Sequence, residues 1–251
     1  MFVWNGSAGD NNWSTAGNWT GNVAPVNDGT AAIVLAGTNQ LVANVDVAWD
    51  ISSLTFSNST GAFVLAGSTL KIRAGGVTNS STNSPIINNA ITLGTNQTWN
   101  AASRTLTFNG DINNVTNLLT ITGNFNSFIG GVISGTGGLT KTGTGTNALA
   151  GANTYSGITT IGAGAINIQN SAALGSTSAG TVIASGATLQ VQAEISVTNE
   201  PLTLNGTGVS ALGALRSLGG DNSWGGVITL AAAATIACDT NNLILGPGGI
   251  V

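Results

Sequence analysis

The sequence predicts an all-β fold in which the chain winds into a parallel β-helix, or β-solenoid, of about 10–11 coils. Apolar–polar–apolar triplets, which indicate short strands with one buried face, recur roughly every 7–15 residues. Between them stand Gly, Asn, Ser and Thr, which tolerate tight turns. Internal recurrence favours a solenoid over a propeller, which needs a period of about 40–45 residues, and over a sandwich, which needs none.

Residues 1–30 are predicted to form an N-terminal segment that is rich in Trp, Asn and Gly. Trp4, Trp13 and Trp19 fall within it without a regular period. A solenoid needs a cap over its open first coil, and large aromatic rings can supply one. The alternative function of these residues is a platform on which exposed rings stack against a glycan.

Residues 31–251 are predicted to form the β-helix itself. Its clearest triplets are 54–56, 70–72, 91–93, 106–108, 119–121, 166–168, 189–191 and 202–204. Coils stack about 4.8 Å apart, so each outward position recurs as a column in which like charges would repel. Ladders of Asn, Thr and Ser avoid that repulsion, which accounts for a charged content of only 6 %. Trp49, Trp99 and Trp224 lie within coils and are expected to fill the core.

Two recurrences bear on how the coils are arranged. Segment 164–168 is similar to 186–191, and the two start 22 residues apart, which suits one coil. Segment 90–93 is similar to 227–230 at a shift of 137, and the same shift carries Leu106 onto Leu243. The second match predicts that residues 243–251 form one more coil, equivalent to the coil at 106–112.

The segment 137–169 carries a specific motif. It reads Gly137-Gly138-Leu139-Thr140-Lys141-Thr142-Gly143, then Leu149-Ala150-Gly151-Ala152-Asn153-Thr154-Tyr155-Ser156-Gly157, then Thr159-Thr160-Ile161 and Gly164. This motif closely resembles the autotransporter-associated β-strand repeat, which reads roughly G-G-L-T-K-x-G, L-x-G-x-N-T-Y-x-G, T-x-I-x-x-G. Such repeats occur in the passenger domains of large bacterial surface proteins, and the segment from Trp4 to Trp19 resembles their opening segment.

The resemblance implies a right-handed parallel β-helix that is secreted or attached to the cell surface. Repeats of this kind act as stalks and spacers and often as adhesin bodies, and they do not imply catalysis. Within the motif, the resemblance implies that Tyr155 packs at a turn. No secretory signal is visible, because the first four residues lack a cationic region. We therefore expect this chain to be a mature piece of a longer protein.

Composition excludes several classes of function. With no histidine and one cysteine, the chain cannot hold a histidine-based triad, a histidine metal site or an internal disulfide. Five Lys and Arg among 251 residues, with a net charge of −4, argue against nucleic-acid binding. The longest apolar stretch, around residues 231–234, is far shorter than the roughly 20 residues that span a membrane, so no membrane insertion of this segment is expected.

The polar residues offer few candidates for chemistry. Asp46 and Asp50 are four residues apart, roughly 13 Å along a strand, which is too far for either arrangement of glycosidase carboxylates. Lys71 and Arg73 lie near each other without an acidic cluster, and the oxygen-rich turns at 10–12 and 27–29 are explained by Asx turns without calcium. We therefore predict no catalytic residue, no cofactor and no metal site. Cys238 follows an apolar strand and is expected to be a buried free thiol.

Three functions stay open at this point. The first is a non-enzymatic structural module, such as a stalk, spacer or filament subunit. The second is an adhesin or carbohydrate-binding module that uses exposed aromatic residues, with surface polysaccharide as the partner. The third is an ice-binding solenoid, suggested by the Thr-x-Thr patterns at 105–107 and 120–122, although these patterns are sporadic.

Self-association is a further expectation. The last charged residue is Asp239, so the coil at 243–251 is expected to be uncapped. An uncapped coil presents unpaired backbone groups and an apolar cross-section. It is expected either to continue into more repeats or to dock head-to-tail on residues 1–4 of another copy, which would give an open filament.

Overall fold

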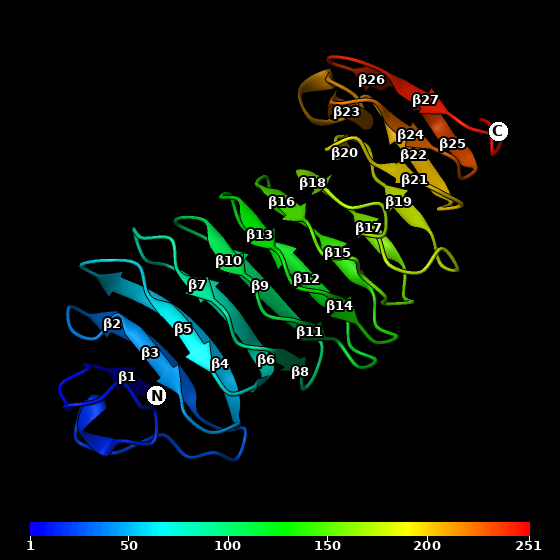
Figure 1. Ribbon diagram of the computed structural model, residues 1–251. Coiled ribbons are helices and arrows are strands. Elements are labelled where there is room, and N and C mark those ends of the chain that lie inside the picture. The colour runs from blue at the N-terminus through cyan, green and yellow to red at the C-terminus, as the bar shows by residue number, and fades with distance from the viewer.

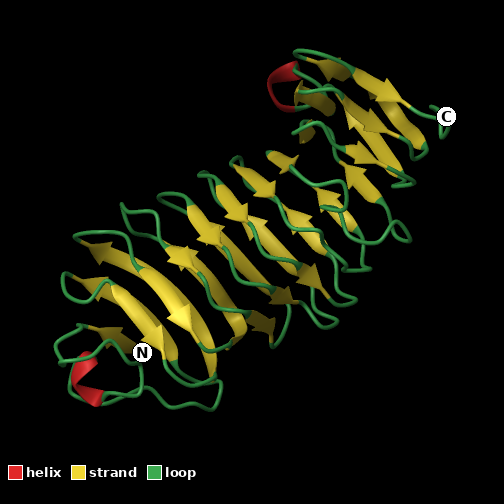
Figure 2. Ribbon diagram, viewed as in Figure 1, coloured by secondary structure: helices red, strands yellow, loops and turns green.

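Parallel strands dominate the computed structural model, which describes residues 1–251 as a right-handed β-helix of about ten turns (Figure 1). The coils follow one another in chain order, and the two termini lie at opposite ends of the stack (Figure 1). Helix is confined to two short 3-10 segments, η1 (Ala16–Asn18) and η2 (Val209–Ala211), which Figure 2 shows near the two ends. The predicted fold class is confirmed.

The strands form three sheets. The main path of sheet A is β1 (Phe2–Trp4), β2 (Ala32–Gly37), β4 (Trp49–Ser59), β6 (Leu70–Asn79), β9 (Gln97–Ala101), β12 (Leu119–Thr122), β15 (Leu139–Lys141), β17 (Thr159–Ile161), β19 (Thr181–Ile183), β22 (Leu202–Gly206) and β25 (Ile228–Ala234). A branch of sheet A contains β8 (Ile91–Leu93), β11 (Ile112–Asn113) and β14 (Ile133–Ser134). Its strands are joined to the main path through the long strand β6, which pairs with both β8 and β9.

Sheet B has ten strands and sheet C has three. Sheet B contains β3 (Val42–Val45), β5 (Val64–Gly67), β7 (Ile86–Ile87), β10 (Leu106–Phe108), β13 (Ser127–Ile129), β16 (Thr146–Leu149), β18 (Ala165–Ile168), β20 (Thr188–Gln192), β23 (Leu215–Gly219) and β26 (Ile236–Cys238). Sheet C contains β21 (Ser196–Val197), β24 (Asn222–Trp224) and β27 (Leu243–Leu245). Every pairing between named strands is parallel, because each coil hydrogen-bonds to the coils before and after it.

The core is one continuous column between the sheets. Side chains alternate in and out along each strand, so most triplets have a buried–intermediate–buried pattern. The inward residues join in a single hydrophobic cluster of 49 buried residues that runs from Trp4 to Ile228. Trp49, Trp99 and Trp224 belong to this cluster, as expected.

Glycine columns make the tight corners possible. The Cβ of a residue replacing Gly131 would lie 2.2 Å from the carbonyl oxygen of Gly110, and one replacing Gly151 would lie 2.3 Å from that of Gly131. Consecutive coils therefore touch backbone to backbone at this corner, with no room for a side chain. The motif at 137–169 holds two more columns of this kind, because Gly157 packs on the backbone of Gly137 and Gly164 on that of Gly143.

The two sequence recurrences have different outcomes. The match between 164–168 and 186–191 is real, because β18 and β20 are neighbours in sheet B with Ile166 opposite Leu189. The 137-residue match does not reflect equivalent positions. Leu106 lies in sheet B, whereas Leu243 lies in sheet C, and residues 91–93 and 228–230 belong to different parts of sheet A. Similar triplets serve all the faces, so a short match does not identify a face.

Candidate functional site

The three N-terminal tryptophans lie inside the molecule. Trp4, Trp13 and Trp19 have exposed fractions of 1 %, 0 % and 0 %. Trp19 makes edge-to-face contacts with Trp4 at 5.2 Å and Trp13 at 5.7 Å, and Trp13 also contacts Trp49 at 6.0 Å. Rings with covered faces cannot stack on a sugar. The three rings fill the interior at the first coils. None of them is exposed for the glycan stacking that was the alternative function.

Polar groups of the same segment hold the loop in place. The Trp19 indole N–H donates to the carbonyl oxygen of Trp13 at 2.7 Å. The Asn18 amide group, which is buried, donates to the carbonyl oxygens of Asp10 and Asn12, both at 3.0 Å. Backbone and side-chain donors from Asn12 and Thr15 lower the pKa of Asp10. The oxygen atoms of the turn at 10–12 thus accept hydrogen bonds from the chain itself, as an Asx turn does.

The carboxylates of Asp46 and Asp50 bind different partners and do not form a pair. Asp46 accepts hydrogen bonds from the backbone N–H and the hydroxyl of Ser14. Asp50 is bound by Arg73 through two hydrogen bonds of 2.8 Å, and by the Lys71 ammonium at 3.2 Å. Hydrogen bonding from Arg73 is the main cause that lowers the pKa of Asp50. Lys71 and Arg73 have no acidic cluster beside them, but they share one acidic partner, because register places Asp50 directly opposite Lys71 on the neighbouring coil.

The structure offers no concentration of metal ligands and corrects the expectation for the thiol. No group of three or more His, Cys, Asp or Glu side chains lies close enough to hold a metal ion. Cys238 is exposed, not buried. Register places it opposite the buried Ser217, so its side chain has the inward direction that the alternation predicts. β26 is the outermost strand of sheet B, and therefore no further strand covers the thiol.

Three ionisable side chains, Lys141, Tyr155 and Glu200, are buried within the coils, and none was predicted to be catalytic. Lys141 lies in the core column between Ile121 and Ile161. Its ammonium donates to the carbonyl oxygens of Thr142 and Gly143, both at 2.7 Å, and burial lowers its pKa to about 8. Its position as the third residue of a Leu139-Thr140-Lys141 triplet was the signal that the side chain points inward.

Glu200 belongs to a buried polar column. Its Oε1 accepts a hydrogen bond of 2.8 Å from the Thr181 hydroxyl, while its Oε2 is buried without a partner. Thr181 stacks on Thr159, whose hydroxyl shares a 2.5 Å hydrogen bond with the Tyr155 hydroxyl. Burial raises the pKa of Glu200 to about 7 and also raises that of Tyr155. Tyr155 is fully buried next to the bend at Gly157, which agrees with the packing role that the resemblance implies.

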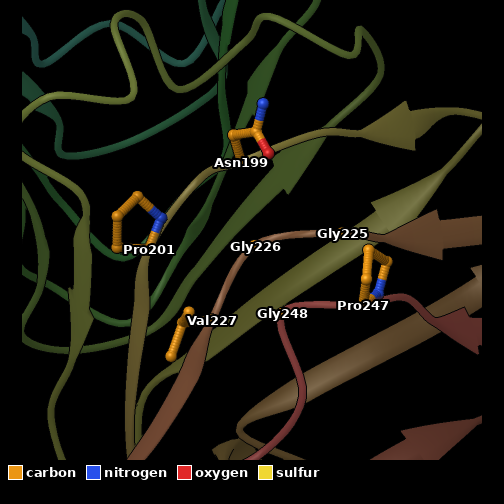
Figure 3. A pocket seen from close by; sticks show the side chains of 7 residues that line it. All are labelled: Asn199, Pro201, Gly225, Gly226, Val227, Pro247 and Gly248. Carbon is orange, nitrogen blue, oxygen red and sulfur yellow. The ribbon is translucent and has the colours of Figure 1, made fainter.

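One pocket opens near the C-terminal coils, with a volume of about 310 Å³ (Figure 3). It is lined by Asn199, Pro201, Gly225, Gly226, Val227, Pro247 and Gly248. None of these residues carries a titratable or nucleophilic side chain, and Asn199 supplies the one polar side chain (Figure 3). The pocket therefore offers no acid, base or nucleophile for catalysis.

Comparisons with known proteins agree with the fold and with the motif. The family described as passenger-associated-transport-repeat matches residues 139–168. Over 114 residues the chain is 33 % identical to a protein of Brucella suis biovar 1 (strain 1330) named "Adhesin BmaC autotransporter". That alignment covers 45 % of this chain and 3 % of the relative. No solved structure matches the chain.

These matches have consequences for location and class. Passenger repeats imply a place outside the cell or at its surface, and neither match indicates an enzyme family. No helix of the chain has both the length and the apolar character needed to cross a membrane. Residues 139–168 thus carry a passenger-associated-transport-repeat, and the continuous right-handed β-helix and the two matches make the chain similar to autotransporter passenger proteins.

Proposed function

We propose that residues 1–251 act as a rod-shaped, non-enzymatic spacer within a larger surface passenger. The observation that carries this proposal is the unbroken parallel ladder of sheet A, whose main path runs from β1 to β25 in chain order. At about 4.8 Å per coil, this path spans on the order of 50 Å. A rod that is hydrogen-bonded along its axis transmits position from one end to the other without a flexible joint.

Tag display on a bacterial surface tests the spacer role. The chain is placed between a membrane anchor and a terminal peptide tag, and antibody access to the tag is measured on encapsulated cells. A variant with a duplicated coil, residues 137–156, is expected to increase access because it lengthens the rod. A flexible Gly/Ser insertion of equal length is the control. Equal access for all three proteins would contradict the spacer role.

The adhesin role is the alternative, and the name of the Brucella relative favours it. This role has no support from exposed aromatic rings of tryptophan, because all six tryptophans are buried or nearly so. Attachment of chain-coated beads to host cells distinguishes the two functions, since a pure spacer should attach no better than beads coated with an inert protein. Ice binding has less support, because the Thr-x-Thr patterns at 105–107 and 120–122 lie on sheets B and A and do not share a face.

Head-to-tail self-association is part of this proposal as a second mode of use. Leu245 and Ile250 are exposed on the last coils, where apolar side chains favour contact with another chain or a further coil. At the other end, the Val3 carbonyl oxygen accepts a hydrogen bond from the Thr20 N–H, so a docking strand would have to displace that segment from β1. Sedimentation velocity at rising concentration tests the contact, and a species that stays monomeric at all concentrations would contradict it.

A further inference from the structure

Threonines form a row on the outward face of the sheet A main path. Register places Thr120 opposite both Thr98 and Thr140, and Thr140 opposite Thr160. The pairings of β19, β22 and β25 continue the row, with Val182 as its one interruption. From β9 to β25 the threonines of this row are Thr98, Thr120, Thr140, Thr160, Thr203 and Thr229.

A second row runs beside the first. Thr55 lies opposite Thr78, and Asn100 lies opposite both Thr78 and Thr122. These positions are two residues along the strand from the first row, and hence roughly 6.7 Å away on the same face. The two rows share the coils of β9 and β12, so this threonine grid is two positions wide there and one position wide along the rest of the face, with about 4.8 Å between coils.

The other outward columns have a different composition. The sheet A branch continues from Asp50 and Lys71, which form an ion pair, to Thr92. The equivalent column of sheet B contains Ile86, Thr107 and Phe128, and near the C-terminal end Arg216. If outward threonine reflected strand propensity alone, it would recur on all faces. The threonine grid is specific to one face, and from β9 to β25 the outward positions of that face carry no charged side chain.

The hydroxyls of this grid are free to bind. None of the nine threonines makes a side-chain hydrogen bond within the protein; they are Thr55, Thr78, Thr98, Thr120, Thr122, Thr140, Thr160, Thr203 and Thr229. By contrast, outward polar groups elsewhere are paired internally, as in the Asn109–Asn88 amide pair and the ion pair of Arg216 with Asp239. Each free hydroxyl offers one donor and two acceptor sites.

We infer that this threonine face is a docking surface for a neutral, extended polysaccharide lying along the rod. Threonine presents a hydroxyl and a methyl group together, which matches the hydroxyls and C–H groups of a sugar ring. The absence of charge removes any preference for an anionic or cationic polymer. A flat face cannot enclose a small soluble sugar, as a concave site does, but it can contact a long, straight chain at every coil.

Repetition would make the weak contacts effective. One hydroxyl exchanging water for a sugar hydroxyl contributes little, because the two hydrogen bonds are nearly equivalent. A rigid row of such contacts on a rigid chain binds with avidity, since the first contact brings the others into register. Neither partner has to lose much conformational freedom, and this lowers the entropic penalty of binding.

Co-sedimentation with microcrystalline cellulose, a neutral and extended polymer, tests the inference. The wild-type chain is compared with a variant that combines Thr120→Val, Thr140→Val and Thr160→Val, which removes three hydroxyls and keeps the shape and strand propensity. The matched control combines Thr92→Val, Thr107→Val and Thr146→Val, which removes three outward hydroxyls from the other faces. Circular dichroism and melting temperature verify that both variants fold.

The expected result is retention of the wild type and the control, and an affinity at least ten-fold lower for the face variant. Retention should be insensitive to added salt, since no charges take part. Equal or stronger binding of the face variant would overturn the inference in favour of non-specific apolar adsorption. Absence of wild-type binding to cellulose would also overturn it, and thermal hysteresis in that case would assign the face to ice. The tag-display test of the spacer role does not depend on either result.

Discussion

At the scale of single residues, the structure shows polar side chains where an apolar core would be expected. The side chains of Lys141 and Glu200 both point inward, and each forms only a few hydrogen bonds with nearby groups. Lys141 finds backbone carbonyl oxygens, whereas one Glu200 oxygen finds nothing. A buried charge with one donor is strongly disfavoured, so the neutral form of Glu200 is preferred in the folded protein.

Glu200 is therefore expected to make stability fall as pH rises. Its pKa increases from 4.5 to about 7 on folding, so its penalty is absent below about pH 4.5, grows between these values and is complete above about 7. The full effect is on the order of 3 kcal/mol. The chain has no histidine to mask this window. Urea unfolding at pH 5 and 7.5 measures it.

The variant Glu200→Gln is the control for this pH dependence. It keeps an acceptor for Thr181 and cannot ionise, so its stability should change little over the same window and should exceed that of wild type at pH 7.5. Equal stability of the wild type at both pH values would contradict the prediction that Glu200 is buried in its neutral form.

The tryptophans give a second prediction at this scale. All six have exposed fractions of 5 % or less. Their fluorescence should be blue-shifted and should resist quenching by iodide until the chain unfolds, because a charged quencher does not enter a close-packed core. Efficient quenching of the native chain would instead place some of these rings at the surface, where glycan stacking becomes possible.

At the scale of elements, coil stacking depends on corners without side chains. Gly131→Ala would place a methyl group 2.2 Å from the Gly110 carbonyl oxygen. The two coils must then separate locally, and this overpacking is expected to destabilise the chain by about 1–3 kcal/mol. Gly9→Ala is the matched control, because a Cβ at that exposed position meets nothing within 4 Å. Denaturant unfolding of the two variants checks the difference, and equal midpoints would show that the corner can relax.

At the scale of the whole molecule, stability should depend on the number of neighbouring coils. A coil in the middle is paired on both sides, whereas β25, β26 and β27 are the outermost strands of their sheets. Nearest-neighbour coupling therefore predicts that amide hydrogens of 228–251 exchange earlier than those of β12 and β15. Hydrogen exchange read by mass spectrometry tests this gradient. Uniform protection along the chain would indicate a single cooperative unit.

The sequence by itself determined the fold class, the coil spacing and the passenger repeat. Triplets such as Leu106–Phe108 encode which side chains face inward, and glycines such as Gly137 and Gly157 mark corners. These are local properties, since alternation and turn chemistry depend on neighbours in the chain.

Only the tertiary structure decided which residues lie opposite each other on neighbouring coils. Register between coils about 20 residues apart paired Asp50 with Lys71, placed Lys141 in the core column and aligned Thr98, Thr120 and Thr140 in one row. Short triplets are interchangeable between faces, so the 137-residue match could not assign them. The register is fixed by the lengths of the coils and the geometry of their corners. Coil length and corner geometry are in turn set by packing of the whole stack.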